Sequence, residues 1–418
     1  MLKIKKQTLF LAAIILLLLH PYYLYILNTF GSFQAVLSIS SIVILAYCSK
    51  KIVLRRELLP FVLLILWFIL DNYELRVMHS GVNTIVYYIV LLIAVILLSQ
   101  TTVWTSKMPA IMTGLSLPHA IATILILIIP SLYSLIRPFI AAENILYAGY
   151  QTGLTGHYST NGIYLANGVI ACTAVLISDV ISRKKISKKY FALLIVMSFA
   201  LLLTAKRGPL LFSILAILIT FFVSDPSRFE KKLYRFVGIA VFAVTGFIIA
   251  AGIIPELQRI IERFNVSGSA LTSGREVMYG LAFKMFFMDI VFGTGFGSYR
   301  YAYHSVLGRV DGQFLNSHNV YIQLLAENGI IGLILFLTFT ISVFIKTYKI
   351  IRKLNKSQEK DLEIAPVILS FAYQVFFLMY CVTGNPLYDS MTFYPYCILC
   401  AVVFAYSGYI RGKERRSK

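Results

Sequence analysis

The sequence predicts an all-α polytopic membrane protein with about 12 transmembrane helices, forming one membrane domain over residues 1–418. Hydrophobic residues make up 59% of the chain and charged residues only 13%. A soluble domain is about one quarter charged, so most of this chain needs lipid as its solvent. Continuous apolar runs near the roughly 20 residues that a bilayer core requires recur throughout. Because lipid leaves a free backbone amide unsatisfied, such runs favour helices over a β-barrel.

Polar or basic residues bound each apolar run and set the expected helix ends. The basic start Met1–Lys6 resembles a signal peptide, but no small-residue cleavage site follows it, so the first run is expected to be a retained helix. Two runs, 190–204 and 208–224, lie so close together that they resemble one long helix. The expected spans are 8–28, 34–48, 58–71, 82–99, 109–129, 161–181, 190–204, 208–224, 236–254, 318–345, 365–383 and 392–409.

Lysine and arginine gather on one side of the predicted membrane and set its orientation. With both termini cytoplasmic, the inner side holds 28 of the 38 basic residues and 8 of the 18 acidic residues. The formal charge of +20 therefore lies entirely inside, and the outer side is electrically balanced. This asymmetry is typical of membrane topology and of attraction to anionic lipid, and it argues against nucleic acid as a partner.

One outer segment, 255–317 between spans 9 and 10, is the only expected extramembrane stretch longer than 60 residues. Loops of that length are usually functional or disordered. We expect short amphipathic helices at 256–264 and 274–288, followed by a turn at Phe292–Gly297. We interpret the glycines of that turn as backbone geometry, because no strand precedes them and the outer face has no nucleotide pool.

Cysteine usage does not indicate a metal centre. The chain has 5 cysteines, and Cys397 and Cys400 have metal-like spacing inside an apolar run without further ligands nearby. Packing in the helix core is the expected role. We therefore predict no metal and no cofactor.

The first cationic candidates, Lys206 and Arg207, interrupt apolar sequence at the outer end of a predicted hairpin. Ionisable groups at membrane depth are costly and usually functional, although such side chains also reach out to lipid headgroups. Arg207 is the stronger candidate of the two. In the large loop, Arg275 stands near an expected helix start, where the dipole disfavours a cation. A functional role and an ion pair with Glu276 are both open explanations.

His318 leads into the tenth predicted span. Asn316 or Ser317 is expected to cap that helix, which places His318 in its first turn. The positive end of the helix lowers a histidine pKa, so a neutral imidazole able to accept a proton is expected there. A polar histidine satisfied by water is the alternative. His157 and His304 are also on the outer side and are expected to be structural.

Two arginines and one histidine on the outer face suit glycosyl transfer from a lipid diphosphate sugar. Arginine binds phosphate oxygens in a bidentate manner and stays charged in a dry site. The arginines would hold a diphosphate leaving group, while the histidine takes a proton from an attacking hydroxyl. No acidic pair with metal spacing lies near these residues, so the chemistry does not require a metal.

Several motifs resemble the O-antigen ligase and polysaccharide polymerase superfamily of bacterial membranes. The resemblance covers about residues 200–345 in order and spacing, and its last motif is the most specific. The motifs are Thr204…Arg207, Ser273-Gly274-Arg275, Phe292-Gly293-Thr294-Gly295-Phe296-Gly297-Ser298-Tyr299, Ser317-His318-Asn319-Val320-Tyr321 and Glu327-Asn328-Gly329-Ile330-Ile331-Gly332.

The resemblance implies a GT-C-like helical fold in the bacterial plasma (inner) membrane, with an extracytoplasmic active site. It implies an undecaprenyl-diphosphate-linked glycan donor and an inverting, metal-independent transfer. Arg207 and Arg275 match the arginines thought to engage the diphosphate, and His318 matches the histidine thought to activate the acceptor. Lys206, Asn319 and Glu327 are weaker candidates.

The superfamily contains two activities that differ in acceptor: ligases transfer glycan to lipid A core, and polymerases join repeat units. The Ser-His-Asn-Val-Tyr motif more resembles the polymerases. A lipid-linked oligosaccharide transporter is a further alternative, and it predicts charged residues within many spans. A scaffolding membrane protein is the remaining alternative, and it predicts tolerance of alanine at all three sites.

Overall fold

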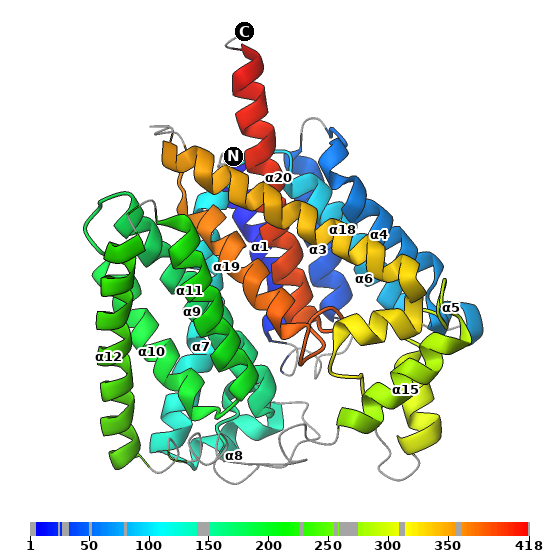
Figure 1. Ribbon diagram of the computed structural model, residues 1–418, viewed down its shortest axis with the longest axis horizontal. Coiled ribbons are helices and arrows are strands. Elements are labelled where there is room, and N and C mark those ends of the chain that lie inside the picture. Colours follow the sequence, from blue (N-terminus) through cyan, green and yellow to red (C-terminus); the bar gives the residue numbers. More distant parts are fainter. Residues whose placement is uncertain are drawn as a thin grey trace. The chain divides into compact units, whose positions relative to one another are not determined.

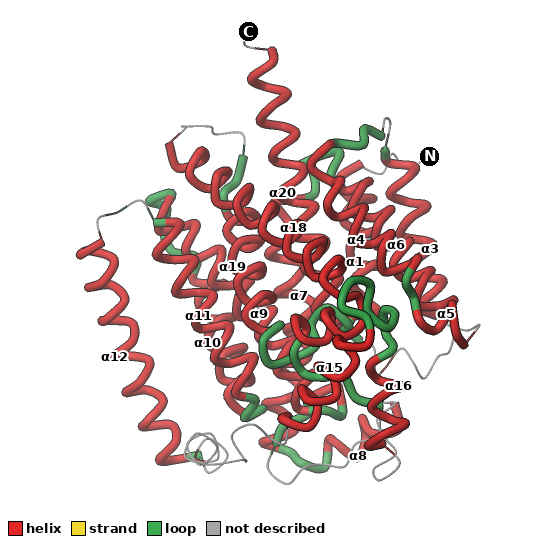
Figure 2. The backbone as a smooth tube through the Cα atoms, turned by 45° about the vertical axis from the view of Figure 1, so that its right-hand side comes forward, coloured by secondary structure: helices red, strands yellow, loops and turns green. Residues whose placement is uncertain are grey.

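The computed structural model describes residues 6–23, 26, 33–49, 52–78, 82–139, 150–225, 227, 229–254, 258, 275–308, 314–356 and 362–416. Within these residues the chain is helical and forms no strand, as Figure 2 shows by colour. A single isolated β-bridge joins Asn72 to Phe296. The predicted all-α class is therefore confirmed for the part of the chain that the structure describes.

The chain divides into two compact units, each assembled from three separate stretches. Unit 1 comprises Met1–Ile44, Thr102–Val266 and Thr347–Phe376. Unit 2 comprises Leu45–Thr101, Ser267–Lys346 and Phe377–Lys418. Three helices, α3 (Phe33–Cys48), α18 (Val320–Lys356) and α19 (Ala365–Tyr380), contribute residues to both units.

Unit 1 is built around α9 (Tyr158–Ile181), which packs against α7, α10 and α11 (Figure 1). Gly168 allows this packing, because an added Cβ would collide with Ser116 of α7 and Met197 of α10. Small residues commonly allow close helix approach in membranes. The other elements are α1 (Lys6–Tyr22), η3 (Thr105–Lys107), α7 (Met108–Ile128), α8 (Leu132–Ile136), η4 (Arg137–Phe139), η5 (Gly153–Thr155), α10 (Lys188–Leu203), α11 (Arg207–Ser224) and α12 (Phe229–Ile253).

Unit 2 contains a group of apolar helices and a set of shorter elements that carry polar groups. Within it α6 packs against both α4 and α20. The elements are η2 (Arg56–Leu58), α4 (Leu59–Leu70), α5 (Tyr73–Met78), α6 (Val82–Leu98), α15 (Arg275–Met288), α16 (Tyr299–Tyr303), η6 (His304–Gly308) and α20 (Ser390–Arg416).

Every expected span coincides with a helix. Among the residues that the structure describes, five helices are long and apolar enough to cross a membrane: Thr105–Ile128, Tyr158–Ile181, Arg207–Ser224, Val320–Lys356 and Ser390–Arg416. Shorter apolar helices accompany them, and the chain is an integral membrane protein. The count of twelve spans and the orientation stay predictions.

The bounds of several expected elements can be compared with the helices of the structure. The runs 190–204 and 208–224 are two helices, α10 and α11, separated by a turn. The span expected at 318–345 begins later, at Val320, and continues to Lys356. Of the two loop helices, 274–288 corresponds to α15, whereas 256–264 lies outside the described residues except at position 258.

Candidate active site

The turn carrying Lys206 and Arg207 belongs to unit 1. Ala205 adopts a φ of +48°, a conformation that L residues rarely take, and Arg207 then opens α11. The Thr204 hydroxyl donates to the Leu201 carbonyl at 2.7 Å. Gly162 of α9 lies against this turn, because its added Cβ would meet Thr204 Oγ1 and Lys206 Cβ at 3.3 Å each. The partly buried cations therefore stand on a well-packed, locally strained turn.

Lys206 faces the start of α9. Its ammonium lies 5.3 Å from the centre of the Tyr158 ring, within the range of a cation–π interaction. The neighbouring His157 is held neutral: burial lowers the pKa of its imidazole, and the Lys206 charge lowers it further. Lys206 thus has local partners that explain its position, and Arg207, the next residue, is the first residue of α11.

In unit 2, the glycine-rich turn after α15 packs backbone against backbone on a break in α18. Gly329 interrupts α18 with a φ of 58° and a ψ of −159°. An added Cβ there would collide with the Val291 backbone, and one on Gly293 would collide with the Glu327–Asn328 peptide. Gly295 N–H donates to the Glu327 carbonyl at 2.7 Å, and Ile330 N–H donates to the Ile290 carbonyl at 2.9 Å. The interpretation of these glycines as backbone geometry is confirmed.

Glu327 joins three elements through a fully buried carboxylate. Its Oε1 accepts hydrogen bonds from the Tyr299 N–H and from Gln323 Nε2, both at 3.0 Å. Its Oε2 accepts one from the Tyr388 hydroxyl at 2.7 Å. These donors come from the first residue of α16, from α18 itself and from the loop before α20. A buried carboxylate with this many donors acts as a structural organiser of the region.

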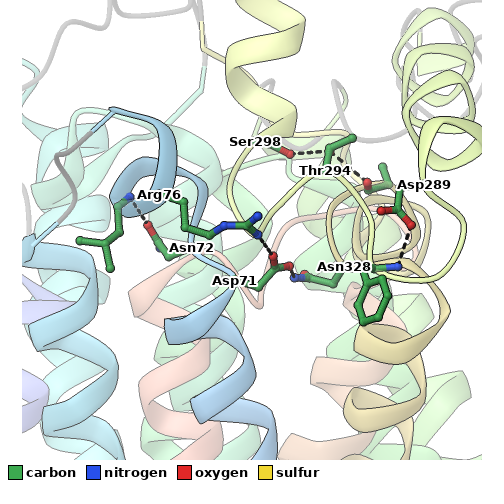
Figure 3. A network of polar contacts seen from close by, with 10 residues as sticks. Asp71, Asn72, Arg76, Asp289, Thr294, Ser298 and Asn328 are labelled. Atoms are coloured by element: carbon green, nitrogen blue, oxygen red, sulfur yellow. Dashed lines mark hydrogen bonds and ion pairs between the residues drawn. The ribbon is translucent and has the colours of Figure 1, made fainter.

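Asp71 forms a second polar contact with α18, through Asn328, the residue that follows Glu327 (Figure 3). It follows α4 and accepts a hydrogen bond from Asn328 Nδ2 at 2.7 Å. Arg76 of α5 pairs with the same carboxylate at 2.6 Å. The Asp71 carbonyl also accepts from the Phe296 N–H at 2.7 Å, beside the isolated bridge. The Glu-Asn-Gly and glycine-rich motifs are therefore tied to the same α4–α5 corner.

The prediction that His318 lies in the first turn of a helix is wrong. It precedes α18 and has a φ of +58°. The cap is neither Asn316 nor Ser317 but Asn319, whose Oδ1 accepts from the N–H groups of Tyr321 at 3.0 Å and Ile322 at 3.2 Å. The expectation failed because the left-handed conformation of His318 delays the start of the helix, so that the cap lies two or three residues later than expected.

Asn385 contacts His318 from the loop between α19 and α20. The His318 N–H donates to Asn385 Oδ1 at 2.9 Å, and Asn385 Nδ2 lies 3.2 Å from the imidazole Nδ1. The preceding Ser317 N–H donates to Gln323 Oε1 at 2.9 Å. The candidate histidine is thus held on both its backbone and its ring.

Arg275 stands at the start of α15, within the same unit as His318. This helix is anchored by Tyr299, whose hydroxyl donates to the Met278 carbonyl at 2.8 Å. Ala282 and Met285 pack in one buried cluster with Tyr299 and Ala326. His318, Asn319 and Glu327 therefore belong to one hydrogen-bonded region, to which α15 is attached. Arg207 and Lys206 belong to unit 1.

Sequence reasoning missed Gln323, Asn385 and Tyr388. Gln323 lies one helical turn before Glu327, a spacing that allows side chains to meet. Asn385 and Tyr388 lie in the segment Gly384-Asn385-Pro386-Leu387-Tyr388-Asp389, which separates two apolar runs. The polarity of that segment was a visible signal, but its partners 57 or more residues away in sequence were not.

A comparison with models of known protein families finds a match to this region of the chain. Residues 192–337 match the model of the family described as O-antigen ligase. The predicted superfamily is confirmed. The matched segment contains Arg207, Arg275, His318 and Glu327, and it indicates a membrane glycosyltransferase of the O-antigen ligase or polymerase type. No curated protein matches the chain.

Side chains that could bind a metal ion do not form a cluster in the part of the chain that the structure describes. Among the described residues, no group of three or more His, Cys, Asp or Glu side chains is placed to hold a metal ion. The cysteines Cys48, Cys172, Cys381, Cys397 and Cys400 are free and buried. The metal-independent reaction stays a prediction.

Proposed function

We propose that the protein transfers glycan from an undecaprenyl-diphosphate donor to a sugar hydroxyl at the outer membrane face. The observation that carries this proposal is the O-antigen ligase match over residues 192–337, which spans all three candidate residues. The left-handed backbone at His318 supports it, because strained residues concentrate at functional sites.

Arg207 and Arg275 are proposed to bind the diphosphate. Each stands at the N-terminal end of a helix, α11 and α15. Free N–H groups and the positive end of the dipole favour an anion there, while a cation alone is disfavoured. An arginine at such a position is well explained if a phosphate group binds beside it. The arginines would stabilise the charge that the diphosphate gains as it leaves.

His318 is proposed to act at the acceptor hydroxyl, in an inverting transfer without a metal. The proposal leans to a surface polysaccharide repeat-unit polymerase, because the Ser317–Tyr321 motif resembles that group. The family description keeps an O-antigen ligase acting on lipid A core as the second candidate. The two differ in product: a polymerase gives a ladder on the lipid carrier, and a ligase gives a single transfer to lipid A core.

Alanine at His318 or Arg275 is expected to abolish surface polysaccharide while protein abundance stays unchanged. The measurement is gel analysis of glycan length and amount in cells that depend on each variant. Arg275→Lys is expected to restore little, because lysine keeps the charge but lacks the bidentate fork.

Lys284→Ala is the matched control, since Lys284 is an exposed cation on the same helix as Arg275. It is expected to leave the glycan pattern as in the wild type. Wild-type glycan in the His318→Ala or Arg275→Ala strain would contradict the proposal.

A further inference from the structure

Asn385 and His318 form a two-point contact whose atoms determine where the imidazole proton lies. The backbone N–H of His318 can only donate, so the Asn385 atom 2.9 Å from it must be the oxygen Oδ1. The amide orientation is thereby set. The atom 3.2 Å from the imidazole Nδ1 is then the amide nitrogen Nδ2, which can only donate.

A donor at this position requires Nδ1 to carry a lone pair. In the neutral imidazole, the single proton then lies on Nε2. In the imidazolium form, Nδ1–H would face the amide N–H, and one hydrogen bond would become a contact between two donors. Rotating the amide does not help, because Nδ2 would then face the backbone N–H. Asn385 therefore favours one tautomer and disfavours the charged ring.

We propose that Asn385 is a positioning residue that holds His318 as the neutral imidazole with its proton on Nε2. His318 then presents a hydrogen-bond donor to the substrate instead of a proton acceptor. This inference rests on the proposed function and revises the sequence-based expectation that the imidazole takes the proton of the acceptor hydroxyl.

The surroundings hold Asn385 in this role. Asn385 is 9% exposed, and three residues later the Tyr388 hydroxyl is bound by Glu327. The Cys381 carbonyl, at the other end of the loop, accepts from the Val320 N–H at 2.8 Å. Among the described residues, the titratable groups around this loop include Tyr380, Cys381, Tyr388 and Asp389 and, from α18, Tyr321 and Glu327. Burial raises the pKa of Tyr388 well above its usual range, so its hydroxyl stays neutral.

The atoms and electrons of the glycosyl transfer balance without a protein side chain acting as the base. The acceptor oxygen forms the new bond to the anomeric carbon while the bond from that carbon to the diphosphate oxygen breaks. The bonding pair leaves with the diphosphate. An inverting attack places the acceptor hydroxyl on the face of the sugar opposite the diphosphate, so the hydroxyl proton passes to water at the outer face. His318 keeps its Nε2 proton and stabilises the oxygen that gains charge by a hydrogen bond.

Nitrogen NMR of the full-length protein in lipid nanodiscs, with ¹⁵N-labelled histidine, tests the tautomer directly. Loss of signals in His318→Ala assigns the ring. In the wild type, Nε2 is expected to show the resonance of a protonated nitrogen and Nδ1 that of a lone-pair nitrogen. A wild-type ring protonated on Nδ1 would overturn the inference. This readout does not depend on glycosyl transfer, so it separates failure of the inference from failure of the proposed function.

The Asn385→Asp variant reverses the direction of the hydrogen bond to the imidazole, because a carboxylate accepts from Nδ1–H. The carboxylate also raises the pKa of the ring. Transfer is expected to persist below the new ring pKa, where the imidazolium keeps an Nε2 proton, and to fall on the alkaline side. Asn385→Ala is expected to lose about tenfold in rate, the equivalent of one hydrogen bond. An Asn385→Asp variant with undiminished alkaline activity would show that Nε2 works as a base.

Tyr388→Phe is the matched control in the same loop. It removes the bond to Glu327 but leaves both contacts of Asn385 to His318. The ring resonances are expected to match the wild type. A change as large as that of Asn385→Asp would assign the effect to the loop as a whole and overturn the specific role of Asn385.

Discussion

At the scale of single residues, the loop between α19 and α20 contains a partly buried acid, Asp389, as well as Asn385, which contacts the candidate histidine. Asp389 immediately precedes α20, and burial raises the pKa of its carboxyl from 3.8 to about 7. Folding thus favours the protonated form. The associated stability is fully present below the ordinary pKa of an aspartate, near 4, and is lost as pH rises through about 7.

The Asp389→Asn variant is expected to remove this pH dependence, because an amide is neutral throughout. Asparagine is also a favoured residue at the position before a helix. Thermal unfolding in detergent should show the variant more stable than the wild type near pH 8, with the difference fading towards about pH 4. A stability difference that stays constant across this range would contradict the prediction.

At the scale of elements, the break in α18 is the feature that shapes the region around His318. Asn319 caps the short first part of the helix, which carries Gln323 and Glu327, and the glycine-rich turn packs against the break at Gly329. Because the two backbones touch, any side chain at the break must displace the chain. The break depends on glycine for both its positive φ and its space.

Gly329→Ala is expected to destabilise the protein by more than about 2 kcal/mol, from the left-handed backbone and the collision with Val291. Gly280→Ala is the control, since Gly280 lies in α15 with no atom within 4 Å of an added Cβ. The control should be neutral or stabilising by up to about 1 kcal/mol. Equal melting temperatures for the two variants would refute this account of the break.

At the scale of the whole molecule, the charge distribution predicts which loops face the cytoplasm. Lys185 lies in a predicted inner loop and Lys284 in the predicted outer loop, and both are exposed. The native cysteines are buried, so a single introduced cysteine reports its own location. A membrane-impermeant thiol reagent should label Lys284→Cys in intact cells and Lys185→Cys only after the membrane is opened. The opposite labelling pattern would reverse the predicted orientation.

The helices could be predicted from the sequence because lipid requires long apolar runs. Such runs can be recognised without knowing which other segments they contact. Sequence reasoning also singled out Arg207, Arg275 and His318, because a charge or an imidazole stands out against apolar sequence, and their roles stay predictions. It placed the helix cap wrongly at Asn316 or Ser317, since a left-handed residue leaves little trace in composition. Gln323 and Tyr388 were missed because their importance lies in one partner, Glu327.

The amino-acid sequence by itself determined the all-helical membrane class and the resemblance to the superfamily, since these follow from composition and short motifs, and it predicts the charge asymmetry across the membrane. The tertiary structure decided what the motifs do for one another. It showed that the glycines serve close backbone contact, that Glu327 joins three elements, and that Asn385 faces His318. The physical reason is that these roles depend on pairs 28 to 67 residues apart, which only folding brings within hydrogen-bond distance.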